Sequence, residues 1–344
     1  MHDIADEASP HGGKIRLLDI ARETGYSITT VSKALNGRSD ISPATRESVE
    51  ESLKRHHYVR RTTPNKKQRT LEIVFQNFDS LWSLEVLRGI LRKTKSQGIS
   101  VTVTESGDRQ HPDSSWIRGI MNRQPLGVVL IFSNLTGHER DMLQSKGIPF
   151  VVFDPSGDPA QDGLSVQADN WTGGLLATRH LLALRHTRIG IITGPDEMMC
   201  SRARLDGYTS ALAERGIAQD PELITEGDFT TAGGYAQAMA LLENPRIRPS
   251  AIFAGSDLQA MGVYEAARQL RIRIPEDLSV VGFDDVQTAA YMGPALTTIR
   301  QPLQEMAGVA AQTLIDISQN KTVQKKVILP TSLVIRNSTR ELDS

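Results

Sequence analysis

Two short helices are predicted near the N-terminus from apolar residues at helical spacing. Gly25 ends the first helix, and Ser27 is a good N-cap for the second. The second helix then turns small polar and basic side chains outward. The predicted inward positions are Leu17, Ile20 and Ala21 in the first helix and Val31, Ala34 and Leu35 in the second.

A third helix is predicted from Pro43 to about His56. Ser42 can cap its N-terminus, and proline suits the first helical position. The side chains that share its apolar face are Val49, Leu53 and His57. The following segment, residues 60–69, contains one proline and five cations, which is typical of a linker that is solvated or lies on phosphate.

Beyond Thr70 the pattern changes to apolar runs of β character that alternate with helical stretches. This alternation indicates βαβ units and parallel sheets with helices on both faces. Two similar α/β lobes, divided between Ala168 and Trp171, fit a segment of this length better than one large sheet. The predicted strands are Leu71–Phe75, Ile99–Thr104, Gly127–Phe132, Phe150–Phe153, Ile189–Ile192, Ala251–Ala254 and Leu278–Phe283.

Charge separates the N-terminal part from the rest of the chain. Residues 14–69 hold 13 Lys and Arg against 6 Asp and Glu, a net charge of +7. The whole chain sums to −1, so the remainder carries −8. This asymmetry is expected of a DNA-binding arm on an acidic body.

The second helix is the predicted recognition helix of a helix-turn-helix. Such a helix enters the major groove, where its outward side chains meet base edges. Many helix-Gly-helix corners touch no nucleic acid, and the surrounding positive charge is what favours DNA binding here. The outward side chains are Ile28, Thr29, Ser32 and Lys33.

Candidate ligand-binding residues follow the predicted strands of the body, because α/β proteins bind ligands at the carboxyl ends of their strands. Carboxylates, an arginine and aromatic rings together suit a molecule rich in hydroxyl groups. Each residue also has a plain structural interpretation: Ser256 and Asp257 could cap the helix that they precede, and Trp82 and Phe229 could be core. The strand exits hold Asn77–Trp82, Asp154, Gly194–Arg204, Ser256 with Asp257, and Asp284 with Asp285.

Composition argues against several other classes of protein. No apolar run is long enough to cross a bilayer, and residues 1–13 have no signal-peptide core, so a cytoplasmic location is expected. His56 and His57 lack partners at metal-ligand spacing, and no cofactor is predicted. Cys200, close to Arg202 and Arg204, is either a small buried pocket residue or a redox-sensing thiol.

The chain resembles the lactose-repressor (LacI/GalR) family of bacterial transcription regulators over nearly its whole length. The matching residues occur in family order. They are Asp19-Ile20-Ala21 through Gly25, Thr30–Gly37, Ile41-Ser42 through Tyr58, Asp169-Asn170 with Gly173, Arg188–Pro195, Ser201 with Arg204, Gly207-Tyr208, Gly227–Phe229, Val280–Asp285, and Leu296–Ile299 with Gln301.

This resemblance implies a dimer that reads a near-palindromic operator and a two-lobed body similar to periplasmic sugar-binding proteins. Ile28, Thr29 and Lys33 match positions that read bases, whereas Ser27, Thr30, Ser32 and Asn36 match positions that contact phosphate or orient the helix. Lys33 is the best candidate to donate to a guanine. In the body, Arg204, Ser256, Asp257 and Asp284 match effector-binding positions, Phe229 a ring-stacking position, and Asp154 and Trp82 the region of the pocket wall.

Two departures from the family pattern stand out. Arg16 replaces the usual Thr or Ser cap of the first helix. The linker also lacks the leucine that wedges into the minor groove and kinks the operator centre. Contact through phosphate or the minor groove, with less bending and a steeper salt dependence, is therefore predicted for Arg60, Arg61, Lys66, Lys67 and Arg69.

The expected organisation is a helix-turn-helix domain (14–59), a basic hinge (60–70) and an effector-binding and dimerisation domain (71–340). Within that domain, lobe 1 is expected at about 71–168 and 297–322, and lobe 2 at about 169–296 and 323–340.

The function predicted is a DNA-binding regulator, usually a repressor, controlled by a sugar or oligosaccharide bound between the lobes. An enzyme and a plain solute-binding protein are the rival classes: no nucleophile and base are evident, and a solute-binding protein has no use for the basic arm.

Overall fold

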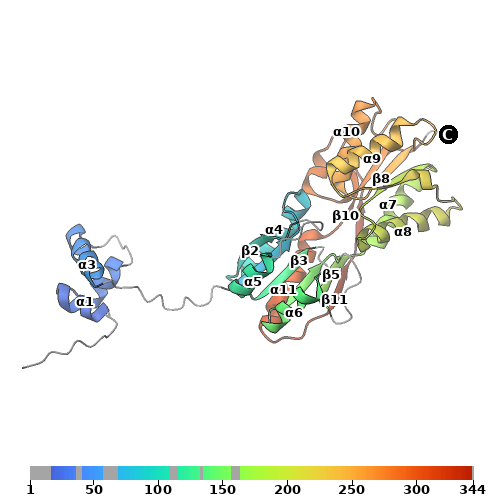
Figure 1. Ribbon diagram of the computed structural model, residues 1–344. Helices are drawn as coiled ribbons and strands as arrows, with labels where there is room; N and C mark the ends of the chain where they lie inside the picture. Colours follow the sequence, from blue (N-terminus) through green and yellow to red (C-terminus); the bar gives the residue numbers. More distant parts are fainter. Residues whose placement is uncertain are drawn as a thin grey trace, which may run out of the picture. The chain divides into compact units, whose positions relative to one another are not determined.

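The computed structural model describes residues 17–35, 41–56, 69–107, 115–131, 135–155 and 163–342. The chain divides into two compact units, residues 1–67 and residues 68–344. Figure 1 shows the helical first unit and the α/β second unit.

The described part of the first unit is helical: α1 (Leu17–Thr24), α2 (Ile28–Leu35) and α3 (Pro43–Arg55). Gly25 has a φ of +72°, a left-handed conformation that glycine adopts at little cost, and it ends α1. The predicted caps are confirmed, since Ser27 Oγ accepts from the Thr30 amide and Ser42 Oγ from the Thr45 amide, both at 3.1 Å. The buried core is formed by Ile20, Ala21, Val31, Ala34 and Val49.

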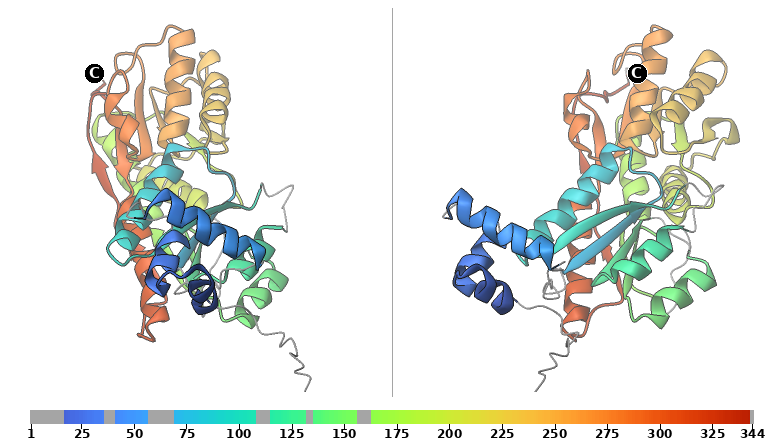
Figure 2. Two further views of the ribbon diagram at one scale, coloured as in Figure 1. Left: turned by 90° about the vertical axis from the view of Figure 1, so that its left-hand side faces the viewer. Right: turned by 60° about the vertical axis from the view of Figure 1, so that its left-hand side comes forward.

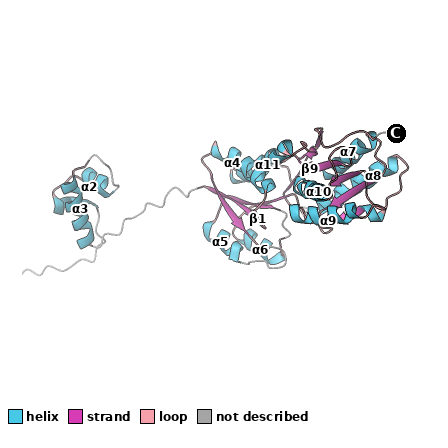
Figure 3. Cartoon of the chain, turned by 90° about the horizontal axis from the view of Figure 1, so that it is seen from above, coloured by secondary structure: helices cyan, strands magenta, loops and turns pink. Residues whose placement is uncertain are grey.

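Lobe 1 of the second unit contains a parallel six-stranded sheet in the order β11-β5-β4-β3-β1-β2. Figure 3 shows helices α4 and α11 on one side of its strands and α5 and α6 on the other. The strands are β1 (Thr70–Phe75), β2 (Ser100–Glu105), β3 (Gly127–Ile131), β4 (Phe150–Phe153), β5 (Ser165–Ala168) and β11 (Lys326–Leu329); the helices are α4 (Leu81–Lys95), α5 (Ser115–Arg123), α6 (Gly137–Ser145) and α11 (Leu303–Ser318).

Lobe 2 contains a second six-stranded sheet, in the order β12-β10-β9-β8-β6-β7, which is parallel except for the antiparallel edge strand β12. Separate apolar clusters lie under α7 with α8 and under α9 with α10. The strands are β6 (Ile189–Thr193), β7 (Ile224–Glu226), β8 (Ala251–Ala254), β9 (Ser279–Asp284), β10 (Thr297–Arg300) and β12 (Ser332–Val334). The helices are α7 (Asn170–Ala183), α8 (Met199–Glu214), α9 (Thr231–Glu243) and α10 (Asp257–Gln269), with short 3₁₀ helices η1 (Pro221–Leu223) and η2 (Gln287–Tyr291).

The C-terminal part of the body is divided between the lobes differently from the expected division. The chain leaves lobe 1 after Ala168, where Asp169 caps α7 of lobe 2. Thr297–Arg300 was expected in lobe 1, but β10 pairs with β9 in lobe 2. Lys326–Leu329 was expected in lobe 2, but β11 pairs with β5 in lobe 1. The C-terminal part, orange to red in Figure 2, thus contributes to both lobes.

Helices α7 and α8 cross at two glycines, and this crossing places the functional side chains of α8. A Cβ atom on Gly174 would lie 2.2 Å from the backbone oxygen of Arg204, and one on Gly207 would lie 2.2 Å from that of Trp171. Only glycine permits this approach of the two backbones. The backbone of Arg204 is therefore held close to the start of α7, next to the crossing between lobes.

Candidate functional site

The second helix of the first unit presents the polar surface that the sequence predicted. Ile28, at 47% exposure, and Thr29 lie open on α2, and Ser27 is exposed at its N-terminus. Thr30, Ser32 and Lys33 are half-buried. An exposed isoleucine beside small hydroxyls and a lysine can contact thymine methyl groups, phosphates and guanine acceptors.

Several of the predicted DNA contacts lie outside the described residues. Arg69 is described: it is exposed and directly precedes β1 at the start of the second unit. Its Nη2 lies 3.5 Å from the hydroxyl of Ser318. The predictions for Arg16, Asn36, Arg60, Arg61, Lys66 and Lys67 fall on residues that the structure does not describe.

In the body, Arg204 of α8 is the centre of a buried polar cluster. Its Nε donates to Asn170 Oδ1 at 2.9 Å, and its Nη1 donates to the carbonyl oxygen of Gly255 at 2.6 Å. The guanidinium carbon lies 3.7 Å from the ring centroid of Phe283 and 5.4 Å from that of Phe229. A guanidinium held by two acceptors and stacked on a ring has a fixed orientation.

Two carboxylates from different lobes are electrostatically coupled to this guanidinium. Asp154 follows β4 in lobe 1 and Asp284 ends β9 in lobe 2; both are buried. Burial raises the pKa of Asp154 to about 6, and the positive charge of Arg204 partly opposes that increase. Burial likewise raises the pKa of Asp284 well above its usual value, again against the effect of Arg204.

Neutral amides orient both carboxylates. Asn170 Nδ2 lies 3.4 Å from Asp154 Oδ1, a long contact that crosses between the lobes. Gln301, directly after β10, donates its Nε2 to Asp284 Oδ1 at 2.6 Å. Neither amide was among the site residues predicted from the sequence, although both directly follow a strand or a crossing between lobes. The strand-exit rule that found the carboxylates would have found them as well.

Three buried polar atoms around this cluster have no hydrogen-bond partner within the described part of the chain. They are Asp154 Oδ2, Gln301 Oε1 and the hydroxyl of Ser201 on α8. All three side chains are at most 3% exposed. Since buried polar groups in proteins are nearly always paired, these atoms mark a place where a ligand can complete the bonding.

Ser256 takes the capping role that was the alternative interpretation, whereas Asp257 makes other structural bonds that were not predicted. Ser256 caps α10 through the Gln259 amide. Asp257 is fully buried, and its two carboxylate oxygens accept from the Val286 amide at 2.9 Å and from Thr298 Oγ1 at 2.5 Å. The structure thus uses Asp257 to hold the end of β9 against α10.

The two aromatic candidates occupy different environments. Phe229 has a φ of +65° and lies against Gly194, where any Cβ would meet the phenyl ring. This position keeps the ring beside Arg204. Trp82 packs edge-on against Phe153 at 5.8 Å within the core of lobe 1. Trp82 is therefore next to the strand exit that carries Asp154, but as a core residue.

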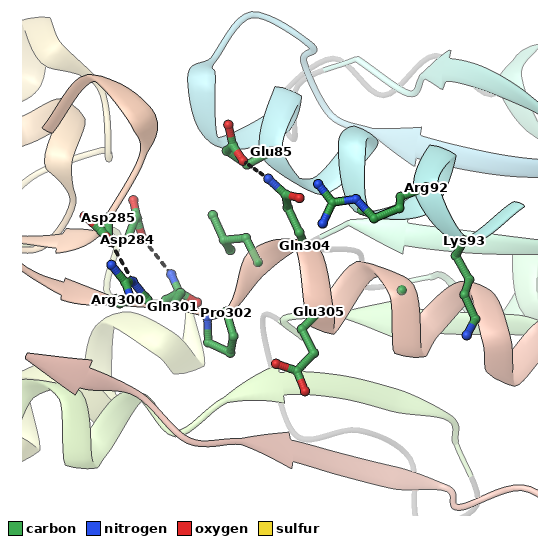
Figure 4. Close-up of a pocket in the computed structure, with 13 residues that line it drawn as sticks. Glu85, Arg92, Lys93, Asp284, Asp285, Arg300, Gln301, Pro302, Gln304 and Glu305 are labelled. Carbon is green, nitrogen blue, oxygen red and sulfur yellow. Dashed lines mark hydrogen bonds and ion pairs between the residues drawn. The ribbon is translucent and has the colours of Figure 1, made fainter. Parts of the chain in front are cut away.

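A cavity of about 490 Å³ lies beside this cluster, between α4, the start of α11 and the exits of β9 and β10. In Figure 4 the guanidinium of Arg92 points toward Gln304, whose amide bonds Glu85. Of the predicted effector residues, Asp284 alone lines the cavity. Asp284 is therefore the predicted residue that this cavity shares with the buried cluster.

Other kinds of site find little support in the described residues. Burial raises the pKa of Cys200 to about 12, the opposite of what a redox-sensing thiolate requires. No group of His, Cys, Asp or Glu side chains within the described ranges could hold a metal ion. Among the helices that can be examined, none is long and apolar enough to span a membrane.

Similarity to known proteins covers both units. Residues 16–61 match the family model for bacterial regulatory proteins of the lacI family, and residues 178–339 match that for a periplasmic binding protein-like domain. The chain is 32% identical to the HTH-type transcriptional repressor CytR of Escherichia coli strain K12, over 94% of this chain and 96% of that protein. It is also 32% identical to the ribose operon repressor of the same strain, over 93% and 98% of the two chains.

Solved structures agree with these relationships. The complex of the transcriptional regulator CelR with cellobiose has a TM-score of 0.71 at 30% identity, covering 94% of this chain and 99% of that one. The lac repressor dimer bound to operator and an anti-inducer has a TM-score of 0.71 at 25% identity, covering 95% and 100%. With a helix-turn-helix, a two-lobed body and full-length relatives, this chain belongs to the lacI family of bacterial regulatory proteins.

Proposed function

We propose that the protein is a transcriptional repressor, active as a homodimer in the cytoplasm, whose affinity for a near-palindromic operator is set by a small molecule. The effector lies between the lobes, at Arg204, Asp154 and Asp284. The observation that carries this proposal is a buried charge cluster with unpaired polar atoms at the crossing between lobes. The chain serves as a regulator without a catalytic role, as expected for its family.

The chemistry of the cluster favours a neutral polyol as the effector. Asp154 Oδ2 and Gln301 Oε1 are unpaired acceptors, which sugar hydroxyl groups can fill as donors. The Arg204 guanidinium can donate to hydroxyl or ring oxygens, and Phe229 offers a flat apolar surface. An anionic ligand would meet the two carboxylates, so a sugar or oligosaccharide is preferred. Ribose- and cellobiose-bound relatives support the same class.

On the DNA side, we propose that Ile28, Thr29 and Lys33 read bases and that Ser27, Thr30, Ser32 and Asn36 position the helix on phosphate. The basic segment 60–69 contacts phosphate or the minor groove without a leucine wedge. Operator bending is therefore expected to be weaker than in a repressor that inserts leucine. A circular-permutation gel assay that shows a sharp central kink would contradict this expectation.

The effector site is tested by replacing Arg204→Lys, which keeps the charge but loses the planar, stacked geometry. Thermal-shift screening of monosaccharides and oligosaccharides identifies a stabilising sugar for the unmodified protein. For Arg204→Lys we expect operator binding in a gel shift to be unchanged and affinity for that sugar to fall at least about tenfold. Arg202→Lys is the matched control, because Arg202 is exposed on the same helix. Equal sugar affinity in both variants would refute the assignment of the site.

A further inference from the structure

The segment Asp284–Gln287, called the β9 strap, runs from the last residue of β9 to the first residue of η2 and contacts both lobes. Asp284 has a φ of +118° and Asp285 a φ of +57°, two consecutive residues in a region that favours glycine. Such a conformation costs free energy and persists only where the surroundings fix it. The contacts on either side of the strap show what fixes it.

Lobe 2 holds the strap through its backbone and its second carboxylate. Asp257 Oδ2 accepts from the Val286 amide at 2.9 Å. Asp285 accepts from Arg300 Nε at 2.7 Å and from Arg336 Nη2 at 2.6 Å, and its side chain is only 8% exposed. The first residue, Asp284, belongs to the proposed effector site, where it accepts from Gln301 and lies within the electrostatic influence of Arg204.

Lobe 1 holds the other end of the strap. The side chain of Val286 is 1% exposed and belongs to the apolar cluster formed by α4, α11 and the lobe 1 sheet, although Val286 follows a strand of lobe 2. Gln287 Oε1 accepts from Arg88 Nη1 of α4 at 3.2 Å. The same Arg88 nitrogen donates to Glu85 at 2.7 Å. One short strap thus connects an effector carboxylate with helix α4.

We propose that the β9 strap couples the effector site to lobe 1, with Gln287 and Arg88 as the positioning residues that transmit movement of Asp284 to α4. The inference builds on the proposed effector site and adds the route by which lobe 1 responds. A packed side chain and a directional hydrogen bond resist sliding, so displacement of Asp284 must carry Val286 and Gln287 with it. Helix α4 directly follows β1, the first strand after the basic segment 60–69.

The test requires neither effector nor DNA, so its outcome is separate from that of the proposed function. Hydrogen exchange of the α4 amides is measured by mass spectrometry on the full chain, with and without Asp284→Asn. This replacement removes a charge from the cluster but leaves an oxygen that can accept from Gln301. We expect Asp284→Asn to change α4 exchange by roughly two- to tenfold, the scale of one hydrogen bond.

The same comparison is made in Gln287→Ala and Arg88→Ala backgrounds. We expect each to abolish most of the response of α4 to Asp284→Asn, and their combination to remove no more than either alone. Arg92→Ala, one turn further along α4, is the control and should leave the response intact. If Gln287 had a purely structural role, Gln287→Ala would change the hydrogen exchange of α4 by itself but would preserve the response of α4 to Asp284→Asn. Such preservation, or an unresponsive α4 in the otherwise unmodified chain, would overturn the proposal.

Discussion

At the scale of single residues, the decisive feature is how the carboxylates around Arg204 are used. Strand exits predicted Asp154, Asp257 and Asp284 from the sequence alone. Whether each carboxylate can accept a hydrogen bond from a ligand depends on groups far away in the chain. Asp257, for example, already bonds Val286 and Thr298, which lie 29 and 41 positions later. Asp154 instead keeps an unpaired oxygen. A sequence pattern places a carboxylate at a site, but only the fold shows whether other groups already bind it.

Asp154 should make stability depend on pH. In the unfolded chain this carboxyl loses its proton near its ordinary pKa of 3.8, whereas burial raises the folded pKa to about 6. Between these values the folded state holds more protons, so the free energy of unfolding falls as pH rises through this window. The loss from Asp154 is on the order of 3 kcal/mol.

Urea denaturation from pH 4 to 8 measures this effect. The Asp154→Asn variant should show a shallower fall than the unmodified protein, and the remaining fall is due to Asp257 and Asp284, because burial also raises the pKa of each. An identical pH profile in the two proteins would contradict a buried, protonated Asp154.

At the scale of elements, periodicity and capping predicted the three N-terminal helices and seven strands of the body, because those signals are local. Ser27 and Ser42 cap α2 and α3 as expected, and strands such as Gly127–Ile131 and Phe150–Phe153 lie where apolar runs placed them. The sheet to which β10 and β11 belong could not be read locally, since a four-residue strand fits either sheet. Pairing with β9 and with β5 decides it.

The glycine crossing of α7 and α8 gives a prediction at this scale. Gly174→Ala places a Cβ against the backbone oxygen of Arg204, so α8 must shift. We expect a loss of about 1–3 kcal/mol in the free energy of unfolding, together with weaker effector binding. Gly308→Ala on α11 is the control. Its Cβ meets nothing within 4 Å, and we expect a gain of about 0.5–1 kcal/mol. Equal stability of the two variants in urea would contradict the role of Gly174.

At the scale of the whole molecule, the proposed repressor is a switch with two ends. A basic stretch, residues 14–69 with a net charge of +7, is joined to an acidic body with a polar cluster between its lobes. The sequence predicted both ends, because charge asymmetry and strand exits are visible in it. The β9 strap that connects the lobes was not predicted, since nothing local reveals that Val286 packs in lobe 1.

The most direct test of this switch is reciprocal binding. Operator affinity is measured with and without the sugar found by thermal-shift screening, and sugar affinity with and without operator. Because the two equilibria are linked, the account predicts that both affinities change by the same factor, typically about 5- to 150-fold. Operator affinity that does not change at saturating sugar, with sugar affinity equally indifferent to operator, would contradict effector control of DNA binding.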